Sequence, residues 1–353
     1  MKGFVLSISV LALTALRNAA ADPVKKSDTV TEDSESEQHT GARPVRKSDM
    51  GMEDSVEHHV PMWTKVGFIG AGNMAQAVAT SLIRTGLCIP AQIIASAPSE
   101  RFKLHWPEPM DFALNDNHRI IKEAEYVFLA MKPQYLDSAI QGLVNDKVTL
   151  NSSRCIISML VGVDLETLKK KLSVLVPNPN DAPTIIRVMP NTAMKYGKGI
   201  TGMCHDLHLD KESEHLNMAI KIMEQGGIVE IIPESMMNSF GAIAGSGCAY
   251  LFLVMDAMAD GAVKQGIPRD MALRIGAQLL KGSGQLVHKD LLRMDHAAQA
   301  HPAVIKDQIC SPGGSTIAGI HALEKAGVRC AFIDAIEAAK KRSDEIGQAA
   351  KNK

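Results

Sequence analysis

Residues 66–75 read VGFIGAGNMA, an apolar run followed by a turn that contains glycine. The run Val66–Ile69 predicts a short buried strand, and the pattern over Gln76–Arg84 predicts a helix. The turn between them fits the GxGxxG/A fingerprint of dinucleotide-binding proteins. In that fingerprint Gly70 makes the tight turn, Gly72 lets a pyrophosphate contact the backbone, and Ala75 lets the helix approach the strand. The stretch predicts a Rossmann-type domain that binds a dinucleotide.

The second expected strand, Gln92–Ala95, ends at a segment that bears on the choice of cofactor. Ser96 stands where an NAD-specific site would place an acidic residue for the ribose 2′-hydroxyl, and Arg101 nearby could accept a 2′-phosphate. NADPH is therefore the favoured cofactor. Glu100 keeps NADH open, because a shift of register would bring its carboxylate to the ribose.

Strand and helix patterns continue to alternate as far as residue 233. Strands are expected at Tyr126–Ala130, Cys155–Met159 and Thr184–Val188, with helices around Asn117–Glu123, Tyr135–Leu143 and Leu165–Leu172. This alternation predicts a doubly wound parallel sheet that binds ligands at the carboxyl ends of its strands. The loops Ala130–Pro133 and Met159–Gly162 follow two such ends. Lys132 is either a catalytic or phosphate-facing lysine or an ordinary surface lysine.

Past Pro233 the pattern is helical. The expected helices are Ser235–Ile243, Tyr250–Gln265, Arg269–His288, Thr316–Ala326 and Val328–Ile346. Long apolar helices with small residues on their faces often need a partner chain to cover them. We therefore expect an all-helical dimerisation domain. It opens at the turn Gly245–Tyr250, for which a plain interhelical loop is the alternative.

Residues 307–324, DQICSPGGSTIAGIHALE, contain a second candidate ligand site. A Pro-Gly-Gly turn precedes a helix, whose first turn presents free backbone N–H groups and the positive end of the helix dipole beside Ser315 and Thr316. Gly313 and Gly314 let a ligand approach the main chain. The stretch predicts a carboxylate pocket, with an ordinary helix start as the alternative.

Composition argues against several classes of protein. The chain has 353 residues, a formal net charge of −1 and no long Lys/Arg run, so no nucleic-acid-binding surface is expected. The six cysteines form no CxxC pair, and the twelve histidines lack partners at metal-ligand spacing. We expect no metal site, and cysteines that serve as small buried residues.

The first 62 residues differ from the remainder. Residues 1–21 have an early lysine, an apolar run and an alanine-rich end, the layout of a cleavable secretory signal; a transit peptide or a buried N-terminal helix is the alternative. The run is too short for a stable membrane span. Residues 22–62 are polar and charged, which predicts a disordered linker. The expected domains after them are 63–233, which binds the dinucleotide, and 234–353, which dimerises and binds substrate.

The sequence is compatible with more than one cellular compartment. The N-terminal segment favours secretion, while a mitochondrial or cytoplasmic location is the alternative. Asn151-Ser152-Ser153 is a potential glycosylation sequon, so its modification in cells would support the secretory route.

Four motifs follow one another along the chain: FIGAGNMA (68–75), FLAMKP (128–133), GSGCAY (245–250) and DQICSPGGSTIAGIHALE (307–324). In this order they closely resemble the pyrroline-5-carboxylate reductases over about residues 65–347, and the last motif is the specific one. The resemblance implies a Rossmann domain followed by a helical domain that interlocks two subunits, sometimes assembled further into decamers. It implies an oxidoreductase of proline biosynthesis that reduces a small cyclic imine, 1-pyrroline-5-carboxylate, to L-proline with NAD(P)H.

The resemblance also implies roles for individual residues. The pyrophosphate and nicotinamide would contact Gly70, Gly72, Asn73 and Met74. The adenosine ribose and its phosphate would lie near Ser96 and Asn117. The nicotinamide would be bordered by Ala130, Lys132 and Pro133. Backbone N–H groups of Gly313, Gly314 and Ser315 would bind the substrate carboxylate, with the Thr316 hydroxyl near the ring nitrogen. Thr316 and Lys132 are the candidate catalytic residues. Because a protonated imine is already electrophilic, positioning it against the cofactor could supply most of the acceleration.

Three features depart from the family pattern. Cys248 stands where the family usually has proline in the GSG-x-AY turn. The family usually has a glutamate shortly before His-Pro, but Ala297 and Gln299 precede His301 here, and Asp295 is the nearest acid. The secretory-looking start is the third departure.

Two other functions stay open. One is a reductase of similar architecture for another imine or keto acid, of the β-hydroxyacid dehydrogenase type, with Lys264 or Lys281 as its catalytic lysine. The other is a dinucleotide sensor that binds NADPH without turning over a cyclic imine.

Overall fold

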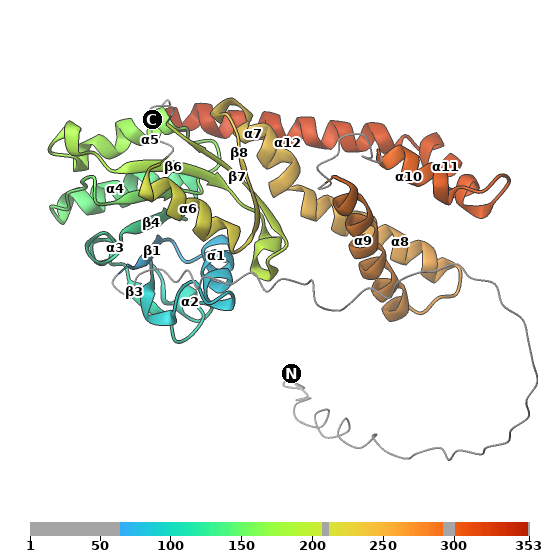
Figure 1. Ribbon diagram of the computed structural model, residues 1–353, viewed down its shortest axis with the longest axis horizontal. Helices are drawn as coiled ribbons and strands as arrows, with labels where there is room; N and C mark the ends of the chain where they lie inside the picture. The colour runs from blue at the N-terminus through green and yellow to red at the C-terminus, as the bar shows by residue number, and fades with distance from the viewer. Residues whose placement is uncertain (1–63, 207–211, 292–300, 352–353) are drawn as a thin grey trace, which may run out of the picture. The chain divides into compact units, whose positions relative to one another are not determined.

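The computed structural model describes residues 64–206, 212–291 and 301–351 (Figure 1). The expected targeting segment 1–21 and linker 22–62 lie outside these residues, as do Asp295, Ala297 and Gln299. The described chain begins with an α/β region built on one sheet and continues as helices.

The sheet has eight strands in the order β3-β2-β1-β4-β5-β6-β7-β8 (Figure 1). Neighbouring strands from β3 to β6 pair in parallel, β7 pairs antiparallel with β6, and β8 pairs in parallel with β7. The strands are β1 (Val66–Ile69), β2 (Ile93–Ala97), β3 (Asp111–Leu114), β4 (Tyr126–Leu129), β5 (Cys155–Ser158), β6 (Thr184–Met189), β7 (Gly199–His205) and β8 (Gly227–Ile231). The doubly wound sheet is confirmed, with an antiparallel extension that the sequence did not predict.

Helices cover both faces of the sheet. On one face, the stacked rings of Phe68 and Phe128, whose centroids lie 4.9 Å apart, belong to a core that includes α1 and α6. On the other face, Val127 and Ile156 belong to a core that includes α3, α4 and α5. The helices of this half are α1 (Asn73–Arg84), α2 (Glu100–Lys103), α3 (Asn117–Glu123), α4 (Leu136–Asn145), α5 (Leu165–Leu172) and α6 (Glu214–Glu224).

The second half of the described chain is helical. It contains α7 (Met237–Phe240), the π-helical turn η7 (Gly241–Gly245), α8 (Gly247–Lys264), α9 (Arg269–Leu291), α10 (Pro302–Ile309), α11 (Ser315–Lys325) and α12 (Val328–Lys351). Helices α8 and α9 lie side by side, and α12 contacts α7 and η7 (Figure 1). The expected all-helical region is confirmed.

The helical stretch Glu234–Lys264 is the most apolar part of this region. By length and composition alone it could cross a membrane, with a mean hydropathy of 1.6, yet only 11% of its apolar window is buried within one chain. Phe252 and Leu253 on α8 are exposed. Since exposed apolar surface of this extent marks an interaction site, a second protein chain is a sufficient explanation.

The cysteines divide into two groups. Cys88, Cys155 and Cys204 are buried, as expected, and burial raises the pKa of Cys88 and of Cys204 to about 12. Cys248 and Cys310 are partly exposed and Cys330 is exposed, so the expectation of burial was wrong for these three. Within the described ranges, no three His, Cys, Asp or Glu side chains are placed to hold a metal ion.

Candidate active site

The glycine turn after β1 joins the ends of three strands. The Gly70 N–H donates to the Ser96 carbonyl oxygen at 2.8 Å, and the Ala130 N–H donates to the Ile69 carbonyl oxygen at 2.9 Å. Gly70 has a φ of 108°, and a Cβ there would lie 2.7 Å from the Ala130 carbonyl carbon. Glycine is therefore required, because its loop packs directly against the loop that carries Lys132.

The head of α1 is open. Gly72 is the N-cap residue, no side chain caps the helix, and the first turn contains no acidic residue. A Cβ at Gly72 would meet no atom within 4 Å. The first-turn N–H groups, including those of Asn73 and Met74, are thus left for a ligand, and the helix dipole favours an anion. This geometry fits a dinucleotide pyrophosphate.

The expected adenosine end is assembled from β2 and α3. Ser96 at the end of β2 is fully buried, and its Oγ hydrogen-bonds Oδ1 of Asn117, the first residue of α3. The end of this strand carries Ser96 and no carboxylate. The nearest acidic residue after it, Glu100, is the exposed first residue of α2. Arg101 is exposed, with its guanidinium carbon 4.8 Å from the Phe102 ring centre. These side chains fit a phosphorylated ribose better than a free 2′-hydroxyl.

Lys132 lies in the loop after β4, directly before a short 3-10 helix, and is exposed. Within the described residues its ammonium group has no hydrogen bond or ion pair, so it is available to a ligand. Ala130 and Pro133 beside it are half-buried. A cavity of about 170 Å³ lies beside this loop between α4, α5 and α12.

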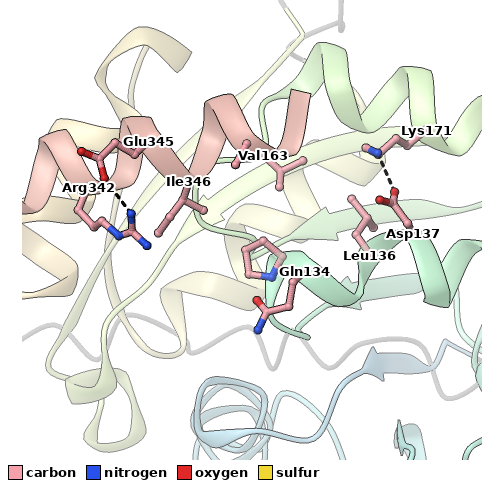
Figure 2. A pocket seen from close by; sticks show the side chains of 10 residues that line it. Gln134, Leu136, Asp137, Val163, Lys171, Arg342, Glu345 and Ile346 are labelled. Carbon is pink, nitrogen blue, oxygen red and sulfur yellow. Dashed lines mark hydrogen bonds and ion pairs between the residues drawn. The ribbon is translucent and has the colours of Figure 1, made fainter. Parts of the chain in front are cut away.

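Four of the charged side chains that line this cavity form ion pairs with one another (Figure 2). The Lys171 ammonium pairs with Asp137 at 2.7 Å, and the Arg342 guanidinium pairs with Glu345 at 2.8 Å. All the residues expected to bind the cofactor lie in the described part of the chain, and Pro133 alone among them lines this cavity. The cavity is therefore a different place from the expected cofactor groove.

The second strand-end loop, Met159–Gly162, is held by α12. A Cβ at Gly347 of α12 would lie 2.6 Å from the Gly162 carbonyl oxygen. The Lys351 ammonium lies 2.5 Å from the Asp164 carboxylate. Burial raises the pKa of Asp164, but hydrogen bonds from Lys351 and Thr167 outweigh it and hold that pKa below its usual range. The C-terminal end of α12 thus supports a loop at the ligand-binding edge of the sheet.

The expected carboxylate pocket lies at the head of α11. Gly314 is its N-cap residue, no side chain caps the helix, and Gly313 has a φ of 67°. The Gly314 N–H donates to the Ser311 carbonyl oxygen at 3.1 Å, so it is engaged within the turn. The N–H groups of Ser315 and Thr316 are left for an anion, and both residues are exposed.

One chain does not bring this turn to the dinucleotide loops. Helix α11 packs on α12, which has 24 residues. At 1.5 Å per residue α12 is roughly 36 Å long, and it is its C-terminal end that contacts Asp164. Figure 1 shows α11 beside the N-terminal half of α12, away from the sheet.

Asn191 is a buried polar residue, just past the end of a parallel strand, that the sequence did not single out. It follows β6, is 8% exposed, and its Nδ2 donates to the Ala244 carbonyl oxygen at 3.1 Å. The signal that could have found it is its place after an expected strand, the same position that drew attention to Lys132 after β4.

The lysines of the alternative dehydrogenase lie on exposed positions of the helical region. Lys264 ends α8, and Lys281 lies within α9.

Two protein-family models match separate parts of this chain. Residues 234–346 match the family model described as pyrroline-5-carboxylate reductase dimerisation. Residues 65–162 match the model described as NADP oxidoreductase, coenzyme F420-dependent.

Solved structures and curated proteins give the same answer. The pyrroline carboxylate reductase of Plasmodium falciparum, solved with NADP bound, aligns over 80% of this chain and 98% of its own, with 26% identity and a TM-score of 0.67. Pyrroline-5-carboxylate reductase 3 of Danio rerio is 36% identical over 80% of this chain and 91% of its own length. The enzyme of Methanosarcina acetivorans is 35% identical over 80% of this chain and 98% of its own. With such identity over nearly whole relatives, this chain belongs to the pyrroline-5-carboxylate reductase family.

Proposed function

We propose that this protein reduces 1-pyrroline-5-carboxylate to L-proline with NADPH, NADH being the alternative donor. The observation that carries the proposal is a pair of uncapped helix heads, one in each half of the chain. The head of α1 suits a pyrophosphate and the head of α11 suits a carboxylate. Membership of the family and the NADP bound to the Plasmodium falciparum relative support both assignments.

The proposed residue roles follow the two heads. The pyrophosphate and nicotinamide contact Gly70, Gly72, Asn73 and Met74. The phosphorylated ribose contacts Ser96 and Asn117. The nicotinamide is bordered by Ala130, Lys132 and Pro133. Gly313, Gly314 and Ser315 hold the substrate carboxylate, with Gly314 shaping the turn because its own N–H is engaged. The Thr316 hydroxyl orients the ring nitrogen, and Lys132 supplies a positive charge beside the cofactor.

The chemistry consists mainly of positioning. Bound NADPH supplies the hydride that the ring carbon of the protonated imine accepts, and the C=N bond becomes the C–N bond of proline. The carboxylate clamp at α11 sets the distance and the face of the ring. No nucleophilic side chain is needed.

We propose that the functional unit is a homodimer with active sites shared between chains. In one chain the turn at Gly313–Thr316 lies at the head of α11, beside the N-terminal half of α12, whereas the C-terminal end of α12 reaches the sheet. A partner chain would therefore supply one of the two halves of the site. The apolar exposed face of α8 and the family match over 234–346 support such a partner. Because some members of the family assemble five dimers into a decamer, we extend the proposal to such a decamer.

The division into a dinucleotide-binding domain at 63–233 and a dimerisation and substrate domain at 234–353 belongs to the same proposal. The last strand, β8, ends at Ile231, and the helical stretch begins at Glu234, which supports the boundary. The targeting segment at 1–21 and its secretory route stay predictions from the sequence.

The test is NADPH oxidation by the purified protein with 1-pyrroline-5-carboxylate, comparing Thr316→Ala with Thr316→Ser. Loss of a hydrogen bond to a charged group costs about 1.5–3 kcal/mol, so Thr316→Ala should lower kcat/KM roughly ten- to hundredfold. Thr316→Ser keeps the hydroxyl and should retain most activity. Tight NADPH binding without turnover in the unaltered protein would instead indicate a dinucleotide sensor.

A further inference from the structure

Asn191 carries a buried acceptor that the protein itself does not satisfy. The residue is 8% exposed, and its Nδ2 donates to the Ala244 carbonyl oxygen at 3.1 Å. Within the described part of the chain, its Oδ1 is buried without a hydrogen-bond partner. An unpaired buried acceptor destabilises the fold, so a native structure usually supplies a donor from a ligand or a water.

The position of Asn191 favours a ligand. It follows β6, which pairs in parallel with β5, so it lies at the carboxyl edge of the sheet where ligands bind. The short helix after it, η5 (Thr192–Tyr196), packs against α1, which begins at the glycine turn. Asn191 therefore lies between the end of β6 and the short helix that packs on α1, at the edge of the sheet where the dinucleotide turn also lies.

The bond to Ala244 ties Asn191 to the other half of the chain. Ala244 lies in the π-helical turn η7, just before the Gly245–Tyr250 turn that opens α8. Turns of this type occur mostly as single-turn bulges within α-helices and are frequent at functional sites. The Asn191 amide thus spans the junction of the dinucleotide and helical regions, with its orientation set by the carbonyl group that accepts from Nδ2.

The other buried polar atom without a partner in the described residues is Trp106 Nε1. Its ring packs edge-on to Phe68 at 5.7 Å inside the core, away from the strand ends. It offers no comparable route to a ligand.

We propose that Asn191 Oδ1 accepts a hydrogen bond from an N–H group of the reacting pair, either the nicotinamide carboxamide or the protonated ring nitrogen of the imine. This inference rests on the function proposed above. A carbonyl-type oxygen can only accept, which rules out the carboxylate and the phosphates as its partners. The two N–H sources share one chemistry, and analogues that lack the N–H distinguish them.

The cofactor arm compares NADPH with its reduced 3-acetylpyridine analogue, in which a methyl ketone replaces the carboxamide. The dissociation constants of both are measured for the unaltered protein, Asn191→Ala and Asn191→Asp. If the carboxamide is the donor, Asn191→Ala weakens NADPH binding about tenfold and leaves the analogue nearly unchanged. The substrate arm compares inhibition by L-proline and by tetrahydrofuran-2-carboxylate, whose ring oxygen has no hydrogen. If the ring nitrogen is the donor, the same selective loss is seen for proline.

Asn191→Asp separates binding from structure. It keeps the acceptor and loses the donor to Ala244, so it should retain the discrimination that Asn191→Ala loses. Equal weakening of both members of each pair would overturn the proposal and leave Asn191 with a structural role or a buried water. Absence of turnover in the unaltered protein would count against the proposed function, whereas normal turnover without selective loss counts against Asn191 alone.

Discussion

At the scale of single residues, two glycines of one turn should respond differently to the same substitution. In Gly70→Ala the new Cβ would meet backbone atoms at 2.7 Å with φ at 108°, so we expect a loss of about 2 kcal/mol or more in the free energy of unfolding. In Gly72→Ala the Cβ meets no atom, so stability should stay within about 0.5 kcal/mol. If a pyrophosphate lies against Gly72, the affinity of the Gly72→Ala protein for NADPH should fall about tenfold.

Urea unfolding and NADPH titration of the two variants check this. Unchanged NADPH affinity in a stable Gly72→Ala protein would show that the cofactor does not approach that backbone. The two variants thus distinguish an effect on stability, at Gly70, from an effect on cofactor binding, at Gly72.

A second residue-scale prediction concerns Glu123. Hydrogen bonds from Lys65 at 2.7 Å and from Arg119 at 2.8 Å lower the pKa of its carboxyl group. A pKa that is lower in the folded state stabilises the fold at neutral pH, and this contribution is lost as the pH falls through the folded pKa. Glu123→Gln should therefore cost about 1 kcal/mol at pH 7, and this deficit should shrink and disappear as the pH falls through the lowered pKa of the carboxyl group.

Unfolding measured between pH 7 and pH 3 checks the Glu123 prediction. Glu224→Gln on α6 is the control, because Glu224 is exposed and has no ion pair in the described residues. A deficit in Glu123→Gln that persists unchanged at pH 3 would contradict the ion-pair explanation.

At the scale of elements, α12 should matter because its end supports a strand-end loop. In Gly347→Ala the added Cβ would lie 2.6 Å from the Gly162 carbonyl oxygen, which forces the helix and the loop apart. We expect a loss of roughly 1–3 kcal/mol in stability and a several-fold rise in the KM for NADPH. Gly142→Ala in α4 is the control, since its Cβ meets no atom and alanine favours the helix. Normal KM and stability in Gly347→Ala would show that the contact yields without cost.

Elements also show where local pattern was too weak for prediction. Strand β3, DFAL, is short and lies at the sheet edge, and β7, GITGMCH, contains two glycines that lower its strand propensity. Helix α12 was expected to end at Ile346, but it continues to Lys351 and pairs with Asp164. Each of these features is stabilised by distant partners rather than by its own periodicity.

At the scale of the whole molecule, a shared active site predicts complementation between two impaired proteins. Gly72→Asp should block the cofactor by charge repulsion, and Thr316→Ala should impair the substrate pocket. In a mixed dimer with shared sites, one site carries both changes and the other carries none. The purified mixed dimer should then show about half of the unaltered activity, because one of its two sites is intact.

Co-expression of differently tagged chains, purification of the mixed dimer and an NADPH oxidation assay check this outcome. Each variant paired with itself is the control. Activity no greater than that of the better control would place both halves of the site within one chain and would contradict the proposed dimer.

The sequence by itself determined the features whose cause is local. The glycine spacing at 70–75 specified a strand, a dinucleotide turn and a helix, and the Pro-Gly-Gly turn before Ser315 specified an open helix head. Only the tertiary structure decided the rest: the antiparallel pairing of β7, the packing of Gly70 on Ala130, the meeting of Gly162 with Gly347, and the Asn191–Ala244 bond. These depend on contacts between segments far apart in the chain, and a local pattern cannot encode which distant backbone atom fills a given space.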